Sequence, residues 1–314
     1  MFCAVSHDAG GAEIISSFVR QQGLPCQYVL AGPALGIFQR KLGPIESLSL
    51  DDALHSADWF LCGTSWQSDL EFKAFELARN AGKKSVAFLD HWINYQERFT
   101  RGGEMHLPDE IWVGDFLSEA IVFKQFPDIV LRFVENPYFL DIKRELVLLK
   151  SPCRVGFDDL SVLYVCEPVR EHALLEYGNE RYWGYTEEEA LRYFLDNLDL
   201  LGSRVGGIVI RPHPSEEYAK YHWVSEEYNL KIFEGGLNPL VQEVAACDVV
   251  VGCESMAMVV GLLAGRRVVS TIPPGGHPCR LPHQQIESLH ALASARLAPA
   301  KCPVVLTTEG IGPL

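Results

Sequence analysis

The sequence lacks a basic excess, a long apolar run and any low-complexity tract. Its 27 Lys and Arg residues are outnumbered by 41 Asp and Glu, which gives a formal net charge of −14. Binding a phosphate backbone requires clustered cations, so this balance argues against a nucleic-acid partner. No stretch reaches the roughly 18 apolar residues of a membrane span, and the opening MFCAVSHDAGG is too short in its apolar run for a secretory signal. We therefore expect a folded cytoplasmic protein.

The usual motifs of metal and dinucleotide sites are also missing. The nine cysteines are odd in number and never spaced as C-x-x-C, and the ten histidines include no H-E-x-x-H pair. We therefore expect reduced cysteines, no protein-bound metal and no resident cofactor. No G-x-G-x-x-G motif is present, which argues against a dinucleotide-dependent oxidoreductase.

The sequence does contain a regular alternation of short apolar runs with amphipathic stretches, which is typical of parallel sheets flanked by helices. The first half predicts strands at 2–6, 26–31, 58–62, 84–89, 110–114 and 130–134. The second half predicts strands at 161–166, 206–210, 230–233, 247–252 and 267–271. Helices are predicted at 11–22, 69–81, 116–125, 186–200, 237–246 and 254–264.

The length of 314 residues suits two domains, which we place at 1–150 and 151–314. The segment 138–160, read as one or two helical turns followed by the loop-like SPCRVGFDD, is the candidate linker. We expect an α/β protein in which two Rossmann-like, parallel-sheet domains face each other across a cleft. Ligands in such sheets bind beyond the carboxyl ends of the strands, so candidate residues are sought there.

The stretch GIVIRPHPSEEY at 207–218 places polar residues at the end of a buried strand. Arg211 and His213 follow the strand directly, and prolines on both sides of the imidazole, Pro214 being the second, make the turn rigid. A rigid imidazole beside a cation suits phosphate recognition. Ser215 and the two glutamates after it predict the N-cap and acidic first turn of a helix. The alternative is a plain surface turn with a solvated histidine.

A second strand end lies in DVVVGCESMAMVVGLLAG at 248–265. Gly252 forms the turn after the strand, and Glu254, Ser255 and Met256 open a helix of small residues. Ser255 either caps this helix or directs its hydroxyl and backbone N–H to a phosphate, and the two roles are compatible. Glu254 offers a carboxylate to a ribose.

Together, segments 206–265 resemble the nucleotide-binding half of GT-B glycosyltransferases. They are most similar to bacterial CMP-sugar-dependent sialyl- and Kdo-transferases of capsule or lipopolysaccharide synthesis. The resemblance implies that His213-Pro214 and Ser255 contact the CMP phosphate. It also implies that 1–150 is the acceptor-side domain and 151–314 the nucleotide-sugar-binding domain. Related glycerol-phosphate polymerases carry a similar R-x-H-P strand end.

The first half supplies a strand end in FCAVSHDAGGAEII. His7, Asp8, Gly10 and Gly11 stand where the first strand turns into the first helix, and the glycines permit a close approach of backbone or substrate. An inverting sugar transfer needs a base for the acceptor hydroxyl, and the resembled enzymes use an Asp or Glu of the amino-terminal domain. Asp8 is the first candidate for this base, although it also suits a turn-forming role.

A polar and aromatic cluster, FLDHWINYQERF, follows the predicted strand 84–89. Asp90 is the reserve base, and either aspartate would be the nucleophile of a retaining mechanism. Aromatic faces stack on sugars while polar groups reach hydroxyls, so the cluster predicts a catalytic and substrate-binding wall. Its alternative is an aromatic packing loop. Besides Asp90 the wall contains His91, Trp92, Asn94, Tyr95 and Arg98.

Weaker signals also follow predicted strands or the linker start: GTSWQSD at 63–69, ENPY at 135–138, CEPVRE at 166–171 and FEGG at 233–236.

The leading hypothesis is a metal-independent glycosyltransferase that moves an acidic sugar from CMP to a glycan or glycolipid hydroxyl. Asp8 would be the base, His213 and Ser255 would stabilise the leaving phosphate, Arg211 would support the anion pocket, and Glu254 or Glu234 would hold the ribose. The alternatives are a UDP-sugar transferase or UDP-sugar 2-epimerase of the same architecture, and a non-catalytic sugar-nucleotide-binding subunit. Peripheral association with the inner face of the membrane, or with a larger assembly complex, stays open.

Overall fold

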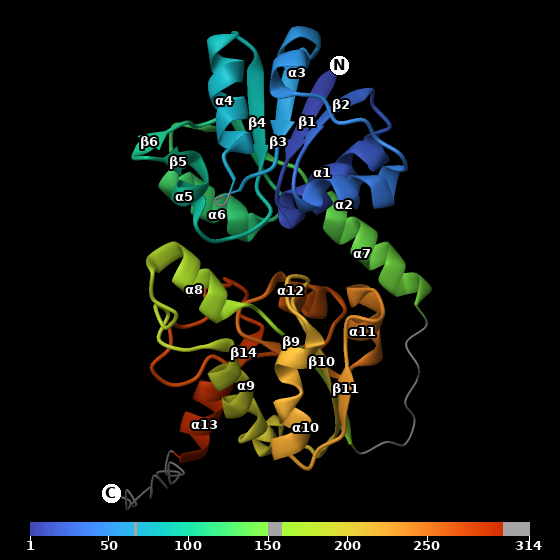
Figure 1. Ribbon diagram of the computed structural model, residues 1–314, viewed down its shortest axis with the longest axis vertical. Coiled ribbons are helices and arrows are strands. Elements are labelled where there is room, and N and C mark those ends of the chain that lie inside the picture. Colours follow the sequence, from blue (N-terminus) through green and yellow to red (C-terminus); the bar gives the residue numbers. More distant parts are fainter. Residues whose placement is uncertain (66–67, 150–158, 298–314) are drawn as a thin grey trace, which may run out of the picture.

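Two α/β units make up the chain in the computed structural model, which describes residues 1–65, 68–149 and 159–297. Each unit is built on a parallel six-stranded sheet, and α7 (Pro137–Leu148) stands between the units along the chain (Figure 1). The expected pair of Rossmann-like units is therefore confirmed. The domain boundary expected at 150/151 falls in the segment 150–158, outside the described residues.

The first sheet has the strand order β2-β1-β3-β4-β7-β8, with every pairing parallel. Helices cover both of its faces, which is why its strands are apolar on both sides. Its strands are β1 (Phe2–Ser6), β2 (Cys26–Leu30), β3 (Trp59–Cys62), β4 (Lys84–Phe88), β7 (Glu110–Val113) and β8 (Val130–Phe133). Its helices are α1 (Ala9–Gln22), α2 (Pro33–Leu42), α3 (Leu50–Ser56), α4 (Leu70–Asn80), α5 (Tyr95–Phe99) and α6 (Phe116–Gln125). A short antiparallel hairpin joins β5 (Thr100–Arg101) to β6 (Glu104–Met105).

The second sheet has the order β11-β10-β9-β12-β13-β14, again wholly parallel. Its strands are β9 (Leu160–Val165), β10 (Val205–Arg211), β11 (Ile232–Glu234), β12 (Val249–Gly252), β13 (Arg267–Ser270) and β14 (Ile286–Ser288). Its α-helices are α8 (Val169–Tyr177), α9 (Glu187–Leu195), α10 (Trp223–Glu227), α11 (Leu240–Ala246), α12 (Met256–Leu263) and α13 (Leu289–Leu297). Two short 3₁₀ helices, η1 (Leu198–Leu201) and η2 (Tyr218–Tyr221), complete the unit.

Each sheet reverses its winding at one point, and this point locates the expected crevice. In the first sheet the chain adds β2 on one side of β1 and then crosses to add β3 on the other. In the second sheet β10 and β11 extend one side of β9 before β12 pairs with its other side. Ligands of doubly wound sheets bind outside the carboxyl ends of the strands at such switch points. The segments after β1 and β3, and after β9 and β12, are therefore the places to examine.

The segment 138–160 is not a simple linker, because its first part belongs to α7. Phe139 and Ile142 of α7 are buried against α11 and α12 of the second unit. On the other side, Gln21 of α1 donates a hydrogen bond to Asp141 at 3.0 Å. Asn136 and Pro137, part of the weak signal ENPY, are the N-cap and first residue of this helix, since proline is well tolerated at that position. The helix thus packs against both units.

Other differences concern helix boundaries and loops. No α-helix begins at Ser215, where a helix start was predicted; the chain instead makes a turn that leads into the short η2. Pro212 and Pro214 flank His213 in this turn, and the backbone N–H of Glu216 donates to the His213 carbonyl at 2.8 Å. The helix predicted at 186–200 ends at Leu195 and continues as η1. The weak edge strand β14 and the helix α8 were not predicted.

Two further features are the state of the cysteines and the length and hydropathy of the helices. The seven cysteines in the described part of the chain are free, and five of them are buried. Cys153 and Cys302 lie outside it. Among the described helices, none combines the length and the hydropathy that crossing a membrane requires.

The first testable prediction concerns Gly252, which the sequence assigned to the nucleotide site. A Cβ at this position would lie 2.7 Å from Val165 Cγ2 and 3.0 Å from the Val165 carbonyl oxygen on the neighbouring strand. We expect Gly252→Ala to lower the free energy of unfolding by about 1–3 kcal/mol through overpacking, measured by urea denaturation.

The matched control is Gly36→Ala in α2, where a Cβ would have open space within 4 Å. This substitution is expected to raise the free energy of unfolding by about 0.5–1 kcal/mol, because alanine favours a helix more than glycine does. An unchanged stability of Gly252→Ala would contradict the tight packing of β12 on β9.

Candidate functional site

A cavity of about 280 Å³ between the two units gathers many of the sequence-predicted residues. It lies where the segment after β4 of the first sheet meets the segments after β9, β10 and β12 of the second sheet. The second-sheet switch point therefore opens into it. Its lining consists of His91, Ile93, Asn94, Arg98, Glu167, Pro168, Val169, His172, Trp183, Tyr185, His213, Glu254, Ser255, Met256 and Arg280.

Glu167, which follows β9 in the weak signal CEPVRE, lies at the centre of the switch point. Its Oε1 accepts the backbone N–H of Glu254 at 2.8 Å, in the turn that leads into α12. Burial raises the pKa of Glu167 to about 7, although backbone hydrogen bonds around the carboxylate act to lower it. A carboxyl with this pKa can hold or release a proton near neutral pH. Sequence reasoning had not assigned it a role.

Ser255 is the N-cap of α12, as the sequence predicted. Its Oγ accepts the backbone N–H of Ala257 at 3.2 Å. Ser255 and Met256 both line the cavity, so the amino terminus of α12 borders it. The positive end of the helix dipole and the unpaired N–H groups of a first helical turn favour anions at such a place.

Arg280 is a lining residue that was not selected from the sequence. It comes from the loop after β13, whose proline and glycine content shows no motif. Its guanidinium forms an ion pair with Glu254, with Nε at 3.1 and 3.2 Å from the two carboxylate oxygens. Its Nη1 lies 3.5 Å from Asn94 Oδ1 of the first unit. Arg280 therefore connects the two units at the cavity through its contact with Asn94. Glu254 is bonded to Arg280 and is not free to bind a ribose.

His213 lines the cavity on the turn after β10. Its Nδ1 lies 2.7 Å from Ser215 Oγ, and its backbone N–H donates to Glu216 Oε2 at 3.1 Å. Burial lowers the pKa of the imidazole, with the nearby His172 ring acting in the same direction and Glu216 against it. The ring is therefore largely neutral at pH 7 and can donate a hydrogen bond to a phosphate oxygen from its other nitrogen.

Four residues assigned to the nucleotide site do not line this cavity. The Arg211 guanidinium turns away to Glu243, at 2.6 Å, because that buried carboxylate lies beside the end of β10. Glu234 borders a separate cavity of about 830 Å³ next to β10 and β11. Pro214 is exposed. Gly252 is buried against β9, where its role is packing.

Asp90 and Arg98 form a buried ion pair below the first-unit side of the cavity. Arg98 Nη1 lies 2.7 Å from Asp90 Oδ1 and also donates to the hydroxyl and carbonyl of Thr64. A Cβ on Gly10 would lie 1.9 Å from Asp90 Oδ2, so Gly10 provides the space for this carboxylate. Gly11 gives similar space to the backbone of Gly63. The two glycines thus permit a close approach, but the groups that approach them are the Asp90 carboxylate and the Gly63 backbone rather than a substrate.

His91 and Asn94 both line the cavity, and their catalytic and substrate-binding roles stay predictions. Burial lowers the pKa of His91 to about 4, with the positive charge of Arg98 acting in the same direction. Its Nδ1 is buried without a hydrogen-bond partner. His91 is thus a neutral imidazole with one unused nitrogen. Asn94 has a left-handed backbone (φ 57°), which asparagine tolerates better than most residues and which is unique among the described non-glycine residues.

Trp92 and Tyr95 do not form the sugar-stacking wall that the sequence suggested. Trp92 is buried, its Nε1 donates to Asp115 at 3.1 Å, and its ring packs edge-on against His283 of the second unit. Tyr95 is 1 % exposed in the core of the first unit. Large aromatic side chains gain more from complete burial than from a solvated wall. The alternative of an aromatic packing loop is correct for both residues.

His7 and Asp8 stand at the first-sheet switch point but not in the lining of the cavity. Asp8 is the N-cap residue of α1, and its Oδ1 lies 2.8 Å from His7 Nδ1. The His7 backbone N–H donates to Glu71 Oε1 at 2.7 Å. Both side chains remain partly exposed. Their proposed roles in proton transfer and substrate binding stay predictions, and so does the wider GTSWQSD signal, of which 66–67 lie outside the described residues.

Within the described ranges, the only group of three His, Cys, Asp or Glu residues close enough to share a metal ion is Glu171, Glu187 and Glu216. The ammonium of Lys220 lies among these three carboxylates.

Three solved structures resemble the chain in fold. The putative UDP-N-acetylglucosamine 2-epimerase of Listeria monocytogenes has a TM-score of 0.54 at 12% identity, and S. aureus MnaA in its co-structure with UDP has 0.56 at 8%; each match covers 86% of this chain and 78% of the other. The UDP-GlcNAc 2-epimerase of Methanocaldococcus jannaschii has 0.53 at 9%, covering 86% and 83%. No family model and no curated protein matches the sequence. The likeness shows that the chain has the expected GT-B fold.

A testable prediction concerns the buried carboxyl of Glu71 at the first-sheet switch point. Glu71 is 1 % exposed, and burial raises its pKa to about 7. Between about pH 4.5 and 7 the native state keeps a proton that the unfolded state releases, so this group makes stability fall as pH rises through that window. We expect Glu71→Gln to match wild type near pH 4.5 and to be more stable by up to about 3 kcal/mol at pH 8.

Urea denaturation of both proteins at the two pH values measures this difference. Glu76→Gln, on the exposed side of the same helix, is the matched control and should show no such dependence. Equal pH dependence in Glu71→Gln and wild type would mean that Glu71 is ionised in the native state.

Proposed function

We propose that the chain is a glycosyltransferase that uses a nucleotide-activated sugar bound in the cavity between its two units. The observation that carries the proposal is the meeting of three groups in one small cavity: the amino terminus of α12, the Arg280 guanidinium and a carboxyl, Glu167, whose pKa is about 7. The first two suit a phosphate, and the third suits proton transfer. The GT-B fold supports this proposal, because ligands of doubly wound sheets bind beyond the carboxyl ends of the strands, where this cavity lies.

The leaving group would be held by His213, the first turn of α12 and Arg280. As the bond between sugar and phosphate breaks, its electrons move to the phosphate oxygen, where negative charge grows. Fixed N–H donors and a guanidinium stabilise this charge best where water is excluded. Arg280 would then divide its hydrogen bonds between Glu254 and the phosphate, taking the place the sequence had assigned to Arg211.

We propose CMP as the carrier of the sugar, because cationic groups are few. Arg98 is neutralised by Asp90, and Arg280 is shared with Glu254, while the lining imidazoles of His91 and His213 have lowered pKa values. A monophosphate needs less neutralisation than a diphosphate, and Arg280 with a helix terminus suffices for it. The sugar would be an acidic one of the Kdo or sialic-acid type, and the acceptor a glycan or glycolipid hydroxyl.

Glu167 is our proposed acid–base group. As the acceptor oxygen forms its bond to the sugar, its proton would pass to the Glu167 carboxylate, and a pKa near 7 matches that task. Asp8 remains the alternative base, since it lies at the facing switch point of the first sheet. A retaining reaction would instead need a carboxylate nucleophile.

A UDP-sugar 2-epimerase is the second candidate. Glu167 lines the cavity, and moving a proton at a sugar carbon requires an acid–base group of this kind. The three similar folds reported above are named as 2-epimerases or contain UDP, which makes UDP the nucleotide to compare with CMP.

Nucleotide binding is the next testable prediction. In calorimetric titrations without added metal, wild type should bind CMP more tightly than CDP or UDP. His213→Ala and Arg280→Met should each weaken CMP binding by about tenfold or more, since a hydrogen bond to a charged group contributes about 1.5–3 kcal/mol. Arg211→Met is the matched control, because Arg211 pairs with Glu243 outside the cavity, and its affinity should be that of wild type.

Preference for UDP would reject the CMP proposal in favour of the epimerase, to be checked with UDP-N-acetylglucosamine. Loss of binding in Arg211→Met but not in Arg280→Met would instead favour the cavity of about 830 Å³ as the nucleotide site, because Glu243, the partner of Arg211, lines that cavity.

Turnover separates an enzyme from a binding subunit. We expect wild type to release CMP from CMP-sialic acid or CMP-Kdo when an acceptor glycan is supplied, and Glu167→Gln to slow this by about 10²–10⁴-fold while still binding CMP. Coupled detection of free CMP measures both. A slow Asp8→Asn with an active Glu167→Gln would assign the base to Asp8 instead. If wild type binds CMP but shows no turnover, the result would favour the alternative of a non-catalytic sugar-nucleotide-binding subunit.

A further inference from the structure

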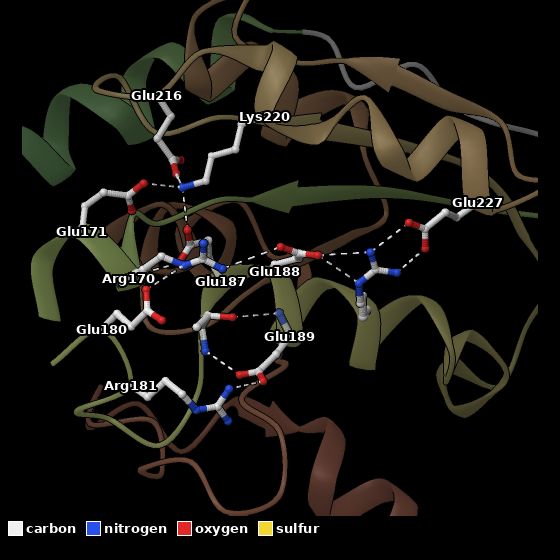
Figure 2. A network of polar contacts seen from close by, with 12 residues as sticks. Arg170, Glu171, Glu180, Arg181, Glu187, Glu188, Glu189, Glu216, Lys220 and Glu227 are labelled. Atoms are coloured by element: carbon white, nitrogen blue, oxygen red, sulfur yellow. Dashed lines mark hydrogen bonds and ion pairs between the residues drawn. The ribbon is translucent and has the colours of Figure 1, made fainter. Parts of the chain in front are cut away.

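Lys220 inserts its ammonium among three carboxylates next to the cavity (Figure 2). Its Nζ lies 2.9 Å from Glu171 Oε1, 2.5 Å from Glu187 Oε1 and 2.7 Å from Glu216 Oε1. These glutamates come from three separate segments: α8, the first turn of α9, and the turn between β10 and η2. One side chain therefore fastens three segments that are distant in sequence.

The ammonium is charged and held tightly. Burial alone would lower the pKa of Lys220, yet the hydrogen bonds to Glu187, Glu216 and Glu171 raise it above its ordinary value. The side chains of Glu187 and Glu216 are each 4 % exposed, so neither can exchange its partner for bulk water. Two buried carboxylates without this cation would carry a large desolvation cost. Lys220 is thus required for these segments to meet.

Glu216 connects Lys220 to His213. While Oε1 of Glu216 accepts from the ammonium, its Oε2 accepts the backbone N–H of His213 at 3.1 Å and the hydroxyl of Tyr221 at 2.9 Å. The carboxylate is therefore fixed on both oxygens. The rigid turn that presents the His213 imidazole to the cavity is held from behind by this chain of contacts.

Glu187 and Glu171 connect Lys220 to the opposite wall. Glu187 Oε2 accepts the backbone N–H of Arg170 at 2.8 Å, in the first turn of α8. The same helix contributes Val169 and His172 to the cavity lining, and its Glu171 also reaches the ammonium. The position of α8 relative to the His213 turn is consequently set through Lys220.

We propose that Lys220 is a positioning residue, which holds the His213 turn and α8 at the spacing that the cavity needs for its nucleotide. It does not line the cavity and would not touch the ligand. The assignment of the ligand as a nucleotide rests on the proposed function. The positioning of His213 does not, so the two can fail separately.

Arg192 provides a matched control in the same polar network. It pairs with Glu188 and Glu227, and Figure 2 shows Glu227 well away from the carboxylates around Lys220. Neither partner lines the cavity. Replacing Arg192 removes a cation and two ion pairs without touching the His213 turn.

The experiment compares Lys220→Met, Lys220→Arg and Arg192→Met in the whole protein. Two readouts are taken on samples checked by thermal unfolding: the titration of the His213 ring, followed by NMR, and the dissociation constant for CMP. Groups facing His213 are Glu216, Ser215 and His172. Without the ammonium, the Glu216 charge acts on the ring uncompensated, so we expect Lys220→Met to raise the His213 pKa and weaken CMP binding about tenfold.

Lys220→Arg keeps the charge and should recover part of both changes, whereas Arg192→Met should leave both at the wild-type value. In a His213→Ala background, Lys220→Met should weaken CMP binding much less than in wild type, because the two substitutions act on one contact. An unshifted His213 titration in folded Lys220→Met would overturn the proposal, as would equal effects of Lys220→Met and Arg192→Met.

Two further outcomes also test the positioning role of Lys220. If Lys220→Met does not fold, Lys220→Arg alone is judged: an altered His213 titration supports positioning, and an unaltered one with unchanged CMP affinity rejects it. If wild type binds no nucleotide, the proposed function fails, but a His213 titration changed by Lys220→Met and not by Arg192→Met still supports the positioning role.

Discussion

Parallel pairing of the strands is the constraint on which the site depends. Because neighbouring strands run in the same direction, the residues that follow them all emerge at one edge of each sheet. Segments that are far apart in the chain, such as those carrying Glu167, His213 and Ser255, are thereby brought to one cavity. The helix α7 packs against both units and so holds the two edges near each other. The chemistry of the cavity follows from this geometry.

Internal ion pairs decide which groups in the cavity remain reactive. Asp90 is paired with Arg98 and Glu254 with Arg280, and the three glutamates behind the wall share the one ammonium of Lys220. Buried charges need such partners, because desolvation otherwise makes them too costly. Glu167 accepts backbone N–H groups but has no ion pair within the described part of the chain, and its burial raises its pKa to about 7. The carboxyl without a counter-charge is the one suited to exchange a proton.

The positions of most strands along the chain could be predicted from local patterns, whereas their order within each sheet came from the structure. Apolar runs mark parallel strands buried on both faces, and the strand ends at His213 and Ser255 carried recognisable residues. The start of α7 was misread because Asn136-Pro137 serves equally as a loop signal and as a helix start. The predicted helix at Ser215 failed since capping residues also occur in turns, and here Ser215 bonds to the His213 ring instead.

The sequence by itself thus determined two α/β units, the edge at which a ligand site would lie, and the capping role of Ser255. Only the tertiary structure decided which polar residues face the cavity: it turned Arg211 toward Glu243, buried Tyr95, and introduced Glu167, Arg280 and Lys220. Periodicity and capping depend on neighbours along the chain, which a sequence displays. Burial, charge pairing and pKa depend on neighbours in space, and these exist only once distant segments have packed together.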